Sequence, residues 1–178
     1  MKLELKNIKV NMEFSEETIM FKADLYVDGT KVAYASNEGR GGSTFYNRYD
    51  NSLSFLLEQA ENYCKSLPSK FVEYGSKTLE LESTLESWID YQIDDYVNMK
   101  EALKFEKKMK THMTNNILYG NNKSYKMIGW KGLTIDQMLA HPIGRQTLIN
   151  KISDLNNKGE TILNTNIPKE LLNIFCID

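Results

Sequence analysis

Residues 1–48 alternate between apolar and polar side chains, a pattern typical of antiparallel strands with one buried face. The alternation breaks at Lys6-Asn7, which predicts a bulge or bend between two extended stretches, 1–6 and 8–14. Residues 19–27 alternate again and end at Asp28-Gly29, a pair that favours a tight hairpin because both turn positions need positive φ. Residues 31–36 and 44–48 follow as a third and a fourth strand. The pattern therefore predicts an N-terminal β-meander.

The apolar period becomes helical from Leu53 and stays so until Pro68, which ends the segment. This helix is expected to cover one face of the sheet. Residues 69–82 form a connection in which 78–82 is a candidate short strand. A long helix is predicted from Ser83 to about Met113, because Ser83-Thr84-Leu85-Glu86 matches a capping box.

The remaining chain predicts shorter elements. Residues 115–122 are predicted to be a turn region, 124–130 a strand, and 134–139 a helix that breaks at His141-Pro142. A helix over 143–155, a strand at 161–163 and a closing helix after Pro168 through Leu171, Leu172 and Phe175 complete the prediction. The expected fold is α+β: an N-terminal antiparallel β-meander packed on a helix, then a long helix and a smaller α/β tail. The simplest division into domains is 1–68 and 69–178.

Composition places this chain of 178 residues among ordinary globular proteins, with 41% apolar and 26% charged residues. No apolar run approaches the roughly 20 residues that a membrane span needs, and the alternating N-terminus does not match a signal peptide. The two cysteines, Cys64 and Cys176, are far apart and are expected to be reduced, buried or semi-buried thiols. We therefore expect a cytoplasmic protein without a membrane partner.

Charge is distributed unevenly along the chain. Residues 1–100 carry 11 basic and 17 acidic side chains, a net charge of −6, whereas residues 101–178 carry 11 and 7, a net charge of +4. The acidic first part argues against a nucleic-acid footprint over the whole surface, and the basic second part leaves room for a local one.

The segment Asn37-Glu38-Gly39-Arg40-Gly41-Gly42-Ser43-Thr44 is the most distinctive in the chain. Its glycines can adopt positive φ and leave backbone N–H groups accessible, and Arg40 adds a planar cation suited to phosphate or carboxylate. Consecutive N–H groups of this kind can form an anion-binding nest. The alternative is a wide hairpin connection in which the glycines only satisfy the turn. The segment matches neither a P-loop nor a dinucleotide-binding fingerprint, because a strand is predicted to follow it.

No catalytic or metal site is nominated. Neither His112 nor His141 has a partner at helical metal-ligand spacing, and no nucleophile–base pair can be assembled. Glu86, Asp90 and Asp94 recur every four residues on the long helix, where a solvated face is the favoured interpretation over a Mg²⁺ site. The favoured expectation is a protein that is not an enzyme; the alternative is an enzyme whose nucleophile and base the sequence does not identify. No cofactor is expected.

The long helix offers two further hypotheses. Trp88, Tyr96 and Leu103 would anchor a partner protein or a second copy of the chain along one stripe. Residues 100–110 form a basic amphipathic segment in which Lys104, Lys107 and Lys108 would contact a partner or nucleic-acid phosphates. The alternative for this segment is a surface helix with internal Glu–Lys pairs.

The run from Lys31 to Thr44, together with Trp130-Lys131-Gly132 and residues 162–166, resembles small uncharacterised accessory proteins of bacteria, phages and mobile elements. The resemblance implies a small intracellular accessory protein, of an anti-defence kind, that binds or sequesters something from the host. It implies no established activity or site.

The leading hypothesis is a non-enzymatic binding protein that captures an anionic small ligand such as a nucleotide. Gly39, Gly41 and Gly42 would supply backbone donors, Arg40 the charge, and Asn37 or Thr44 side-chain hydrogen bonds. The alternatives are a protein-interaction or inhibitor module acting through the long helix, with a host protein as partner, and nucleic-acid binding through 100–110.

Overall fold

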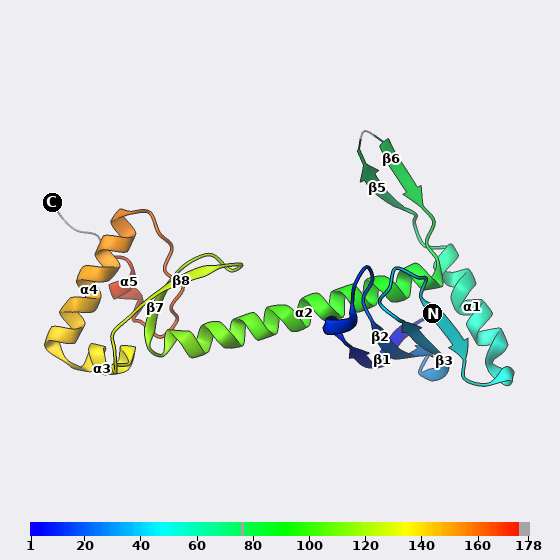
Figure 1. The fold of residues 1–178 in the computed structure, drawn as a ribbon, viewed down its shortest axis with the longest axis horizontal. Coiled ribbons are helices and arrows are strands. Elements are labelled where there is room, and N and C mark those ends of the chain that lie inside the picture. The colour runs from blue at the N-terminus through cyan, green and yellow to red at the C-terminus, as the bar shows by residue number, and fades with distance from the viewer. Residues whose placement is uncertain (76, 175–178) are drawn as a thin grey trace. The chain divides into compact units, whose positions relative to one another are not determined.

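The computed structural model describes residues 1–75 and 77–174 and confirms the α+β fold (Figure 1). Its first half contains an antiparallel sheet with strand order β1-β2-β3-β4. The four strands are β1 (Leu3–Val10), β2 (Phe21–Val27), β3 (Thr30–Asn37) and β4 (Phe45–Arg48). The predicted meander is therefore present, with neighbouring strands joined in chain order.

Two local predictions in the meander are confirmed. The register between β1 and β2 shifts between Lys6 and Lys9, and Asn7 has a φ of 53°. Asp28 and Gly29 both adopt positive φ, 47° and 85°, at the turn between β2 and β3. The extension of the first strand to residue 14 is wrong, because β1 ends at Val10 and Met12–Phe14 forms a 3-10 turn.

Helix α1 (Ser54–Lys65) lies against β2 and β3, as its apolar face predicts. Ala60 and Cys64 on α1 are fully buried with the inward-facing side chains of the sheet. Burial raises the pKa of the Cys64 thiol to about 11. Cys176 and Phe175 lie outside the described residues.

Residues 70–81 form a hairpin, of which the sequence predicts only the second strand. Strand β5 (Lys70–Tyr74) pairs with β6 (Lys77–Leu81), and the two make a separate two-stranded sheet (Figure 1). At its base, the Lys70 ammonium lies 3.0 Å from the centre of the Tyr91 ring.

Helix α2 (Leu85–Met113) begins one residue later than its predicted cap implies. Thr84 rather than Ser83 caps the helix: the Ser87 amide donates to Thr84 Oγ1 at 3.0 Å and the Thr84 amide donates to Ser87 Oγ at 2.9 Å. Ser83 Oγ instead donates to the Pro68 carbonyl. The capping box is real, but it is shifted by one residue, so Glu86 is free to bind elsewhere.

The chain divides into two compact units, Met1–Lys100 and a second that begins at Glu101. The boundary lies within α2 and not at residue 68, because Leu85, Ile89 and Ile93 of α2 are buried in the same core as the sheet and α1. The part of α2 up to Lys100 thus belongs to the N-terminal unit, and the predicted division at 68/69 differs from the observed one for this reason.

The second unit contains its own core. A hairpin of β7 (Asn116–Gly120) and β8 (Tyr125–Gly129) accompanies α3 (Ile135–Ala140), α4 (Pro142–Asn157) and α5 (Lys169–Leu172). The sequence predicts a turn over residues 115–122, but Ile117 and Leu118 are fully buried there, which explains why this short apolar patch is a strand. The predicted strand at 161–163 is reduced to a single bridge between Tyr119 and Ile162.

Two helix boundaries in this unit follow the prediction. Thr134 and Gln137 form the predicted capping box of α3, and Pro142 occupies the first turn of α4 after the break at His141. Within the part of the chain that the structure describes, no helix combines the length and apolar character of a membrane span.

Candidate binding pocket beside the glycine loop

The glycine loop of residues 37–44 folds onto the turn that joins β1 to β2. The Gly39 carbonyl accepts hydrogen bonds from the amides of Glu16 and Glu17, at 2.8 and 3.2 Å. In return, the Gly41 amide donates to Thr18 Oγ1 at 3.2 Å. The loop and the turn therefore hold each other in place.

Steric contact explains two of the three glycines. Gly39 is buried with a φ of 83°, and a Cβ atom there would collide with the Phe14 carbonyl. Gly41 has a φ of 80°, a conformation that residues other than glycine rarely adopt, and a Cβ atom there would also displace the flexible Glu17 carboxylate. Gly42 has neither a positive φ nor a neighbour within 4 Å of an added Cβ atom. Close approach to the protein's own turn thus requires glycine at 39 and 41.

Both polar side chains predicted to bind a ligand at the ends of the loop are buried and bonded within the protein. Asn37 Oδ1 accepts from the Gly39 amide and from Thr18 Oγ1, and its Nδ2 donates to the Gly42 carbonyl at 2.9 Å. Thr44 Oγ1 donates to Asp90 Oδ1 at 2.5 Å, and its amide donates to Glu86 Oε1 at 2.9 Å. The hydrogen bonds within the protein thus use the Gly39 and Gly41 amides and the side chains of Asn37 and Thr44, which the anion-binding hypothesis assigns to a ligand. Arg40 is exposed, and the Gly42 amide has no such bond among the described contacts.

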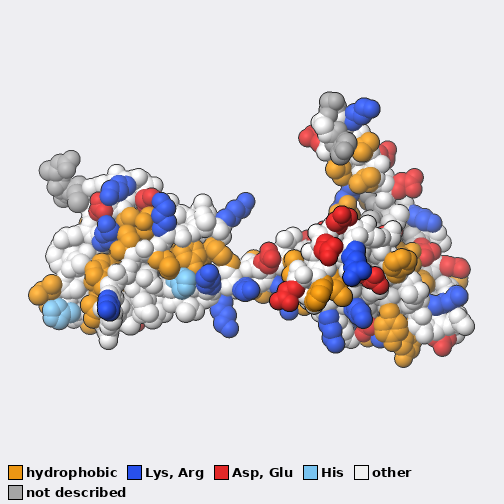
Figure 2. All heavy atoms as spheres, viewed as in Figure 1, with side chains coloured by type: hydrophobic (Ala, Val, Ile, Leu, Met, Phe, Trp, Pro, Cys, Tyr) orange, Lys and Arg blue, Asp and Glu red, His pale blue; other side chains and the backbone are white. Residues whose placement is uncertain are grey.

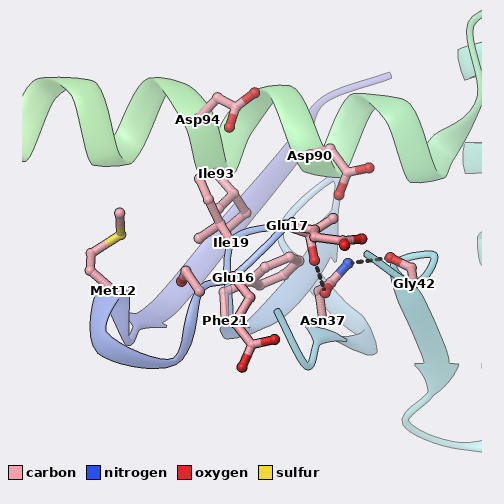
Figure 3. A pocket seen from close by; sticks show the side chains of 12 residues that line it. Met12, Glu16, Glu17, Ile19, Phe21, Asn37, Gly42, Asp90, Ile93 and Asp94 are labelled. Atoms are coloured by element: carbon pink, nitrogen blue, oxygen red, sulfur yellow. Dashed lines mark hydrogen bonds between the residues drawn. The ribbon is translucent and has the colours of Figure 1, made fainter. Parts of the chain in front are cut away.

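A pocket of about 440 Å³ lies beside this loop, between α2 and the turn of residues 12–18 (Figure 3). Its floor is apolar and includes Phe21 and Ile93, which are 3% and 1% exposed. Four carboxylates also line it: Glu16 and Glu17 from the turn, and Asp90 and Asp94 from α2. None of the 12 described lining residues is a lysine or an arginine.

The acidic side chains of α2 have different roles. Glu86 and Asp90 are partly buried and hold the end of the glycine loop through Thr44, whereas Asp94 is exposed. The favoured interpretation of this row as a solvated face is therefore wrong for its first two members. None of the ion pairs of residues 1–75 and 77–174 involves Glu86, Asp90 or Asp94.

Asp90 is the electrostatically perturbed group of the pocket. Burial raises the pKa of its carboxyl above the ordinary aspartate value, and the hydrogen bond from Thr44 acts in the opposite direction. The negative charges of Glu86 and Asp94 raise the pKa of Asp90 further. The ionised carboxylate is thus held where neither solvent nor a neighbouring cation fully compensates its charge.

Positive charge gathers on the other face of the sheet. Lys9, Lys22 and Lys31 line a broad concave region there, together with Tyr34. Lys31 is paired with Asp24 at 2.9 Å, and the pKa of Asp24 is lowered, first by a hydrogen bond from Asn7 and then by this pairing. The basic and acidic surfaces of the first unit are therefore separated by the sheet itself.

The predicted anchors on α2 are not equivalent. Trp88 packs against the first core, and the Tyr96 hydroxyl lies 3.4 Å from the Ile8 carbonyl, so both are partly buried in their own unit. Leu103 is 57% exposed. The structure does not unite these residues into one apolar stripe.

Lys104, Lys107 and Lys108 are exposed. In the described part of the chain, the ion pair of this segment joins Lys110 to Glu106 at 2.6 Å and leaves those three lysines unpaired. His112 accepts or donates a hydrogen bond with the Tyr125 hydroxyl at 3.1 Å, which gives it a structural contact.

The sequence does not identify the pocket residues Met12, Glu16 and Glu17, and it favours a solvated face for Asp94. The only sequence signal for these residues was the polar pair Glu16-Glu17. The proximity of this pair to Asp90 and Asp94 depends on a contact between segments far apart in the chain, which the sequence alone does not show. In the residues that the structure describes, no three His, Cys, Asp or Glu side chains are grouped so that they could share a metal ion.

Comparison with protein-family models, with curated proteins and with solved structures found no match to this chain. The resemblance of residues 31–44 to accessory proteins of phages and mobile elements therefore stays a prediction.

Proposed function

We propose that this chain is a binding protein whose acidic pocket takes up an organic cation, an ammonium or guanidinium group carried on an apolar stem. The observation that carries the proposal is Asp90, a half-buried carboxylate with a raised pKa that lines a cavity with three further carboxylates and no basic residue. A cation beside Asp90 would offset the repulsion that Glu86 and Asp94 exert on this carboxylate and would form a charge-assisted hydrogen bond with it.

The apolar floor defines the rest of the ligand. Phe21, Ile19 and Ile93 would contact carbon atoms, while the carboxylates at the rim would bind the charged end. Pockets that combine apolar walls with a few polar groups favour ligands of matching amphipathic character. The net charge of −6 on residues 1–100 would add long-range attraction for a cation.

The anionic-ligand hypothesis receives less support from the same geometry. A nucleotide phosphate at the glycine loop would lie close to the carboxylates of Glu17 and Asp90, which line the same pocket as Gly42. Two of the three glycine amides already donate within the protein or are sterically enclosed. The remaining basis of the anionic-ligand hypothesis is Arg40. Arg40→Ala is therefore the variant that decides whether any nucleotide binds at the glycine loop.

Isothermal titration calorimetry with matched small molecules tests the proposal. n-Butylguanidine and n-butylamine provide a guanidinium and an ammonium on an apolar stem, whereas n-butanol and butyrate keep the stem with no charge or a negative one. We expect saturable binding of the two cations and none of butanol, butyrate or ATP. A short peptide with one arginine and blocked ends distinguishes a free amine from the side chain of a partner protein.

Two isosteric variants on the same helix localise the binding. Asp90→Asn keeps an acceptor for Thr44 but removes the charge, and it should weaken cation binding at least about tenfold, as expected for a lost charge-assisted hydrogen bond. Asp95→Asn removes the same charge from an exposed position outside this pocket and should leave affinity nearly unchanged. Equal losses in both variants, or equal binding of butanol and butylamine, would refute the proposal.

A second candidate, nucleic-acid binding, is favoured by the three exposed and unpaired lysines of the segment that begins the second unit. Lys104, Lys107 and Lys108 would contact phosphates, and their affinity for DNA or RNA should fall steeply with salt. The triple variant to glutamine should reduce the salt dependence measured by fluorescence anisotropy, whereas Lys131→Gln, also exposed, should not. A wild-type affinity that does not change with salt would exclude this function.

A further inference from the structure

Two lysines lie directly opposite each other on the face of the four-stranded sheet that points away from α1. The register of β1 and β2 pairs Lys9 with Lys22, and both side chains are exposed. Within residues 1–75 and 77–174, neither lysine takes part in an ion pair. Like charges directly opposite each other in a sheet are destabilising. An anion between the two ammonium groups would turn this unfavourable pair into a favourable site.

The row that contains these lysines continues across β3 and β4 and ends in an exposed aromatic ring. Lys22 pairs with Ser36, and Ser36 pairs with Phe45. Because directly opposed residues share one face of an antiparallel pair, all four side chains lie on the same side of the sheet. Phe45 is 63% exposed. The row thus joins two cations on β1 and β2 to an uncovered aromatic side chain on β4.

Two tyrosine rings lie next to this row. Tyr34, two residues before Ser36 on β3, and Tyr49 are 47% and 56% exposed, and their ring centres are 5.4 Å apart. The Lys31 ammonium lies 4.1 Å from the centre of the Tyr34 ring and 5.0 Å from that of Tyr49. Asp24 holds this ammonium at 2.9 Å. Contacts of the protein itself therefore orient the two rings while leaving them exposed.

The lysines and Tyr34 line the broad concave region on this face, which has a volume of about 750 Å³. Its described lining includes three lysines and a single acidic residue, Asp24. The charge of Asp24 is satisfied by Lys31 and by Asn7, whose side-chain amide donates to it at 2.7 Å. Figure 2 shows basic and hydrophobic side chains next to each other over the strands of the first unit. The region therefore offers the opposed lysine pair, beside aromatic rings, to an anionic ligand.

We propose that this basic–aromatic face, made of Lys9, Lys22, Tyr34 and Phe45, binds single-stranded nucleic acid. The lysines would contact phosphates, and bases would stack on the rings. A single strand fits this combination because its bases can turn outward onto a protein surface, whereas those of a duplex are paired and stacked inside it. A polyanion without bases would leave the exposed rings unused. The inference depends neither on the cation pocket nor on the lysines of the second unit.

The negative charge of the first unit does not exclude this ligand. The carboxylates of the candidate pocket lie between α2 and the turn of residues 12–18, on the other side of the sheet. Exposed charges farther apart than the Debye length, about 8 Å at physiological ionic strength, are largely screened from each other. Carboxylates across the sheet therefore act only weakly on phosphates bound at Lys9 and Lys22. Affinity for a strand comes from several phosphates and bases together, so ATP, with a single base, is not expected to saturate this face.

Fluorescence anisotropy with labelled oligonucleotides tests the proposal on the full chain. The probes are oligothymidylate and oligouridylate of about twelve nucleotides and a DNA duplex of the same length, with polyphosphate as an unlabelled competitor. We expect saturable binding of single strands and at least about fivefold weaker binding of the duplex, which loses the stacking of bases on the rings. Every measurement is repeated in the triple variant of Lys104, Lys107 and Lys108 to glutamine, which removes the phosphate contacts proposed for the second unit.

Two sets of variants localise the binding. Phe45→Ala removes a stacking ring and should weaken single-strand binding at least about fivefold, whereas Phe55→Ala, which removes a similarly exposed ring from α1, should not. The double variant Lys9→Gln and Lys22→Gln removes two phosphate contacts and should lower the slope of log affinity against log salt by about 1.4. Lys65→Gln, at the end of α1, should leave that slope unchanged. All five positions are exposed, so the variants should fold, which thermal unfolding without ligand checks.

Single-strand binding that persists in the triple variant and depends on Phe45 would support the sheet face whatever the outcome for the second unit. Equal losses in Phe45→Ala and Phe55→Ala, or an unchanged salt dependence in the double lysine variant, would place the binding elsewhere and overturn the proposal. Duplex binding as tight as single-strand binding, or equally effective displacement by polyphosphate and by unlabelled oligothymidylate, would overturn it by showing a general polyanion site. Absence of saturable single-strand binding in the triple variant would overturn it in favour of the second unit.

Discussion

Single residues of the glycine loop show how a binding-like motif can be structural. The sequence correctly located an unusual loop after β3, because three glycines within four positions are visible without any structure. It could not reveal that Gly39 and Gly41 are needed for contact with the turn of residues 12–18, since that contact joins segments with no local relationship. A cluster of glycines signals close approach, but the approaching group can be the protein itself.

Replacing Gly39 should therefore be costly, whereas replacing Gly42 should not. Gly39→Ala forces a Cβ atom onto the Phe14 carbonyl at a φ of 83°, and we expect a loss of about 1–3 kcal/mol in the free energy of unfolding. Gly42→Ala enters open space at an ordinary φ and should change stability by less than about 1 kcal/mol, with a stabilising effect allowed. Urea denaturation of both variants checks this. Equal effects would contradict the steric explanation.

Asp90 predicts an unusual dependence of stability on pH. Because the pKa of Asp90 is raised in the folded state, the folded protein binds more protons than the unfolded chain between the ordinary and the raised pKa. Ionisation of Asp90 therefore does not lower the free energy of unfolding at pH values below the ordinary aspartate pKa, and it lowers it fully at pH values above the raised pKa of the folded state. Asp90→Asn should stabilise the protein at neutral pH, by less than about 1 kcal/mol for this half-buried group, and lose the advantage on acidification.

Thermal unfolding of Asp90→Asn and wild type across acidic and neutral pH measures that difference. A variant that is less stable than wild type at neutral pH would show that the carboxylate contributes to the fold through Thr44 and is not a cost. A gain in stability combined with a loss of cation binding is the expected signature of a residue kept for binding.

Secondary-structure elements were predictable where their periodic pattern was long. The meander, α1 and α2 each contain several repeats of their period, so their type followed from the sequence. Of the four strands of five residues, β6 and β8 were predicted, but β5 was missed and β7 was taken for a turn. A short run carries too few repeats of its period, and its state is decided by tertiary packing. The cap of α2 was displaced by one residue because Ser83 and Thr84 are chemically equivalent as caps.

Two alanine substitutions distinguish those caps. Thr84→Ala removes the acceptor of the Ser87 amide and should cost about 0.5–2 kcal/mol of stability. Ser83→Ala removes only an exposed hydrogen bond to Pro68 and should cost less. Chemical denaturation gives both values. A larger loss for Ser83→Ala would mean that the helix begins at the residue that the sequence pattern favours.

At the scale of the whole molecule, the chain contains two separate cores, and the buried side chains of α2 that belong to a core belong to the first. The first contains the sheet, α1 and the start of α2; the second contains β7, β8 and the C-terminal helices. The position of the division could not be read from composition, although the two units differ in net charge, −6 for residues 1–100 and +4 for residues 101–178. The candidate pocket depends on this division, because Asp90 and Asp94 of α2 belong to the same unit as the turn of residues 12–18.

Core substitutions should reveal the separation. Ile89→Ala and Leu148→Ala each remove a fully buried side chain, one from each core, and each should cost about 2–5 kcal/mol within its own unit. Hydrogen exchange of the full chain should show faster exchange across residues 1–100 for Ile89→Ala, while the amides of α4 stay protected. Uniform loss of protection in both variants would show that the units unfold as one.

The most direct test of the account is a carbon-detected NMR titration of the Asp90 side-chain carboxyl, with and without saturating n-butylguanidine. The account predicts a pKa above that of an ordinary aspartate in the free protein and a marked decrease on adding n-butylguanidine, because a bound cation favours the ionised form. An Asp90 pKa that n-butylguanidine leaves unchanged would contradict the claim that this pocket binds a cation.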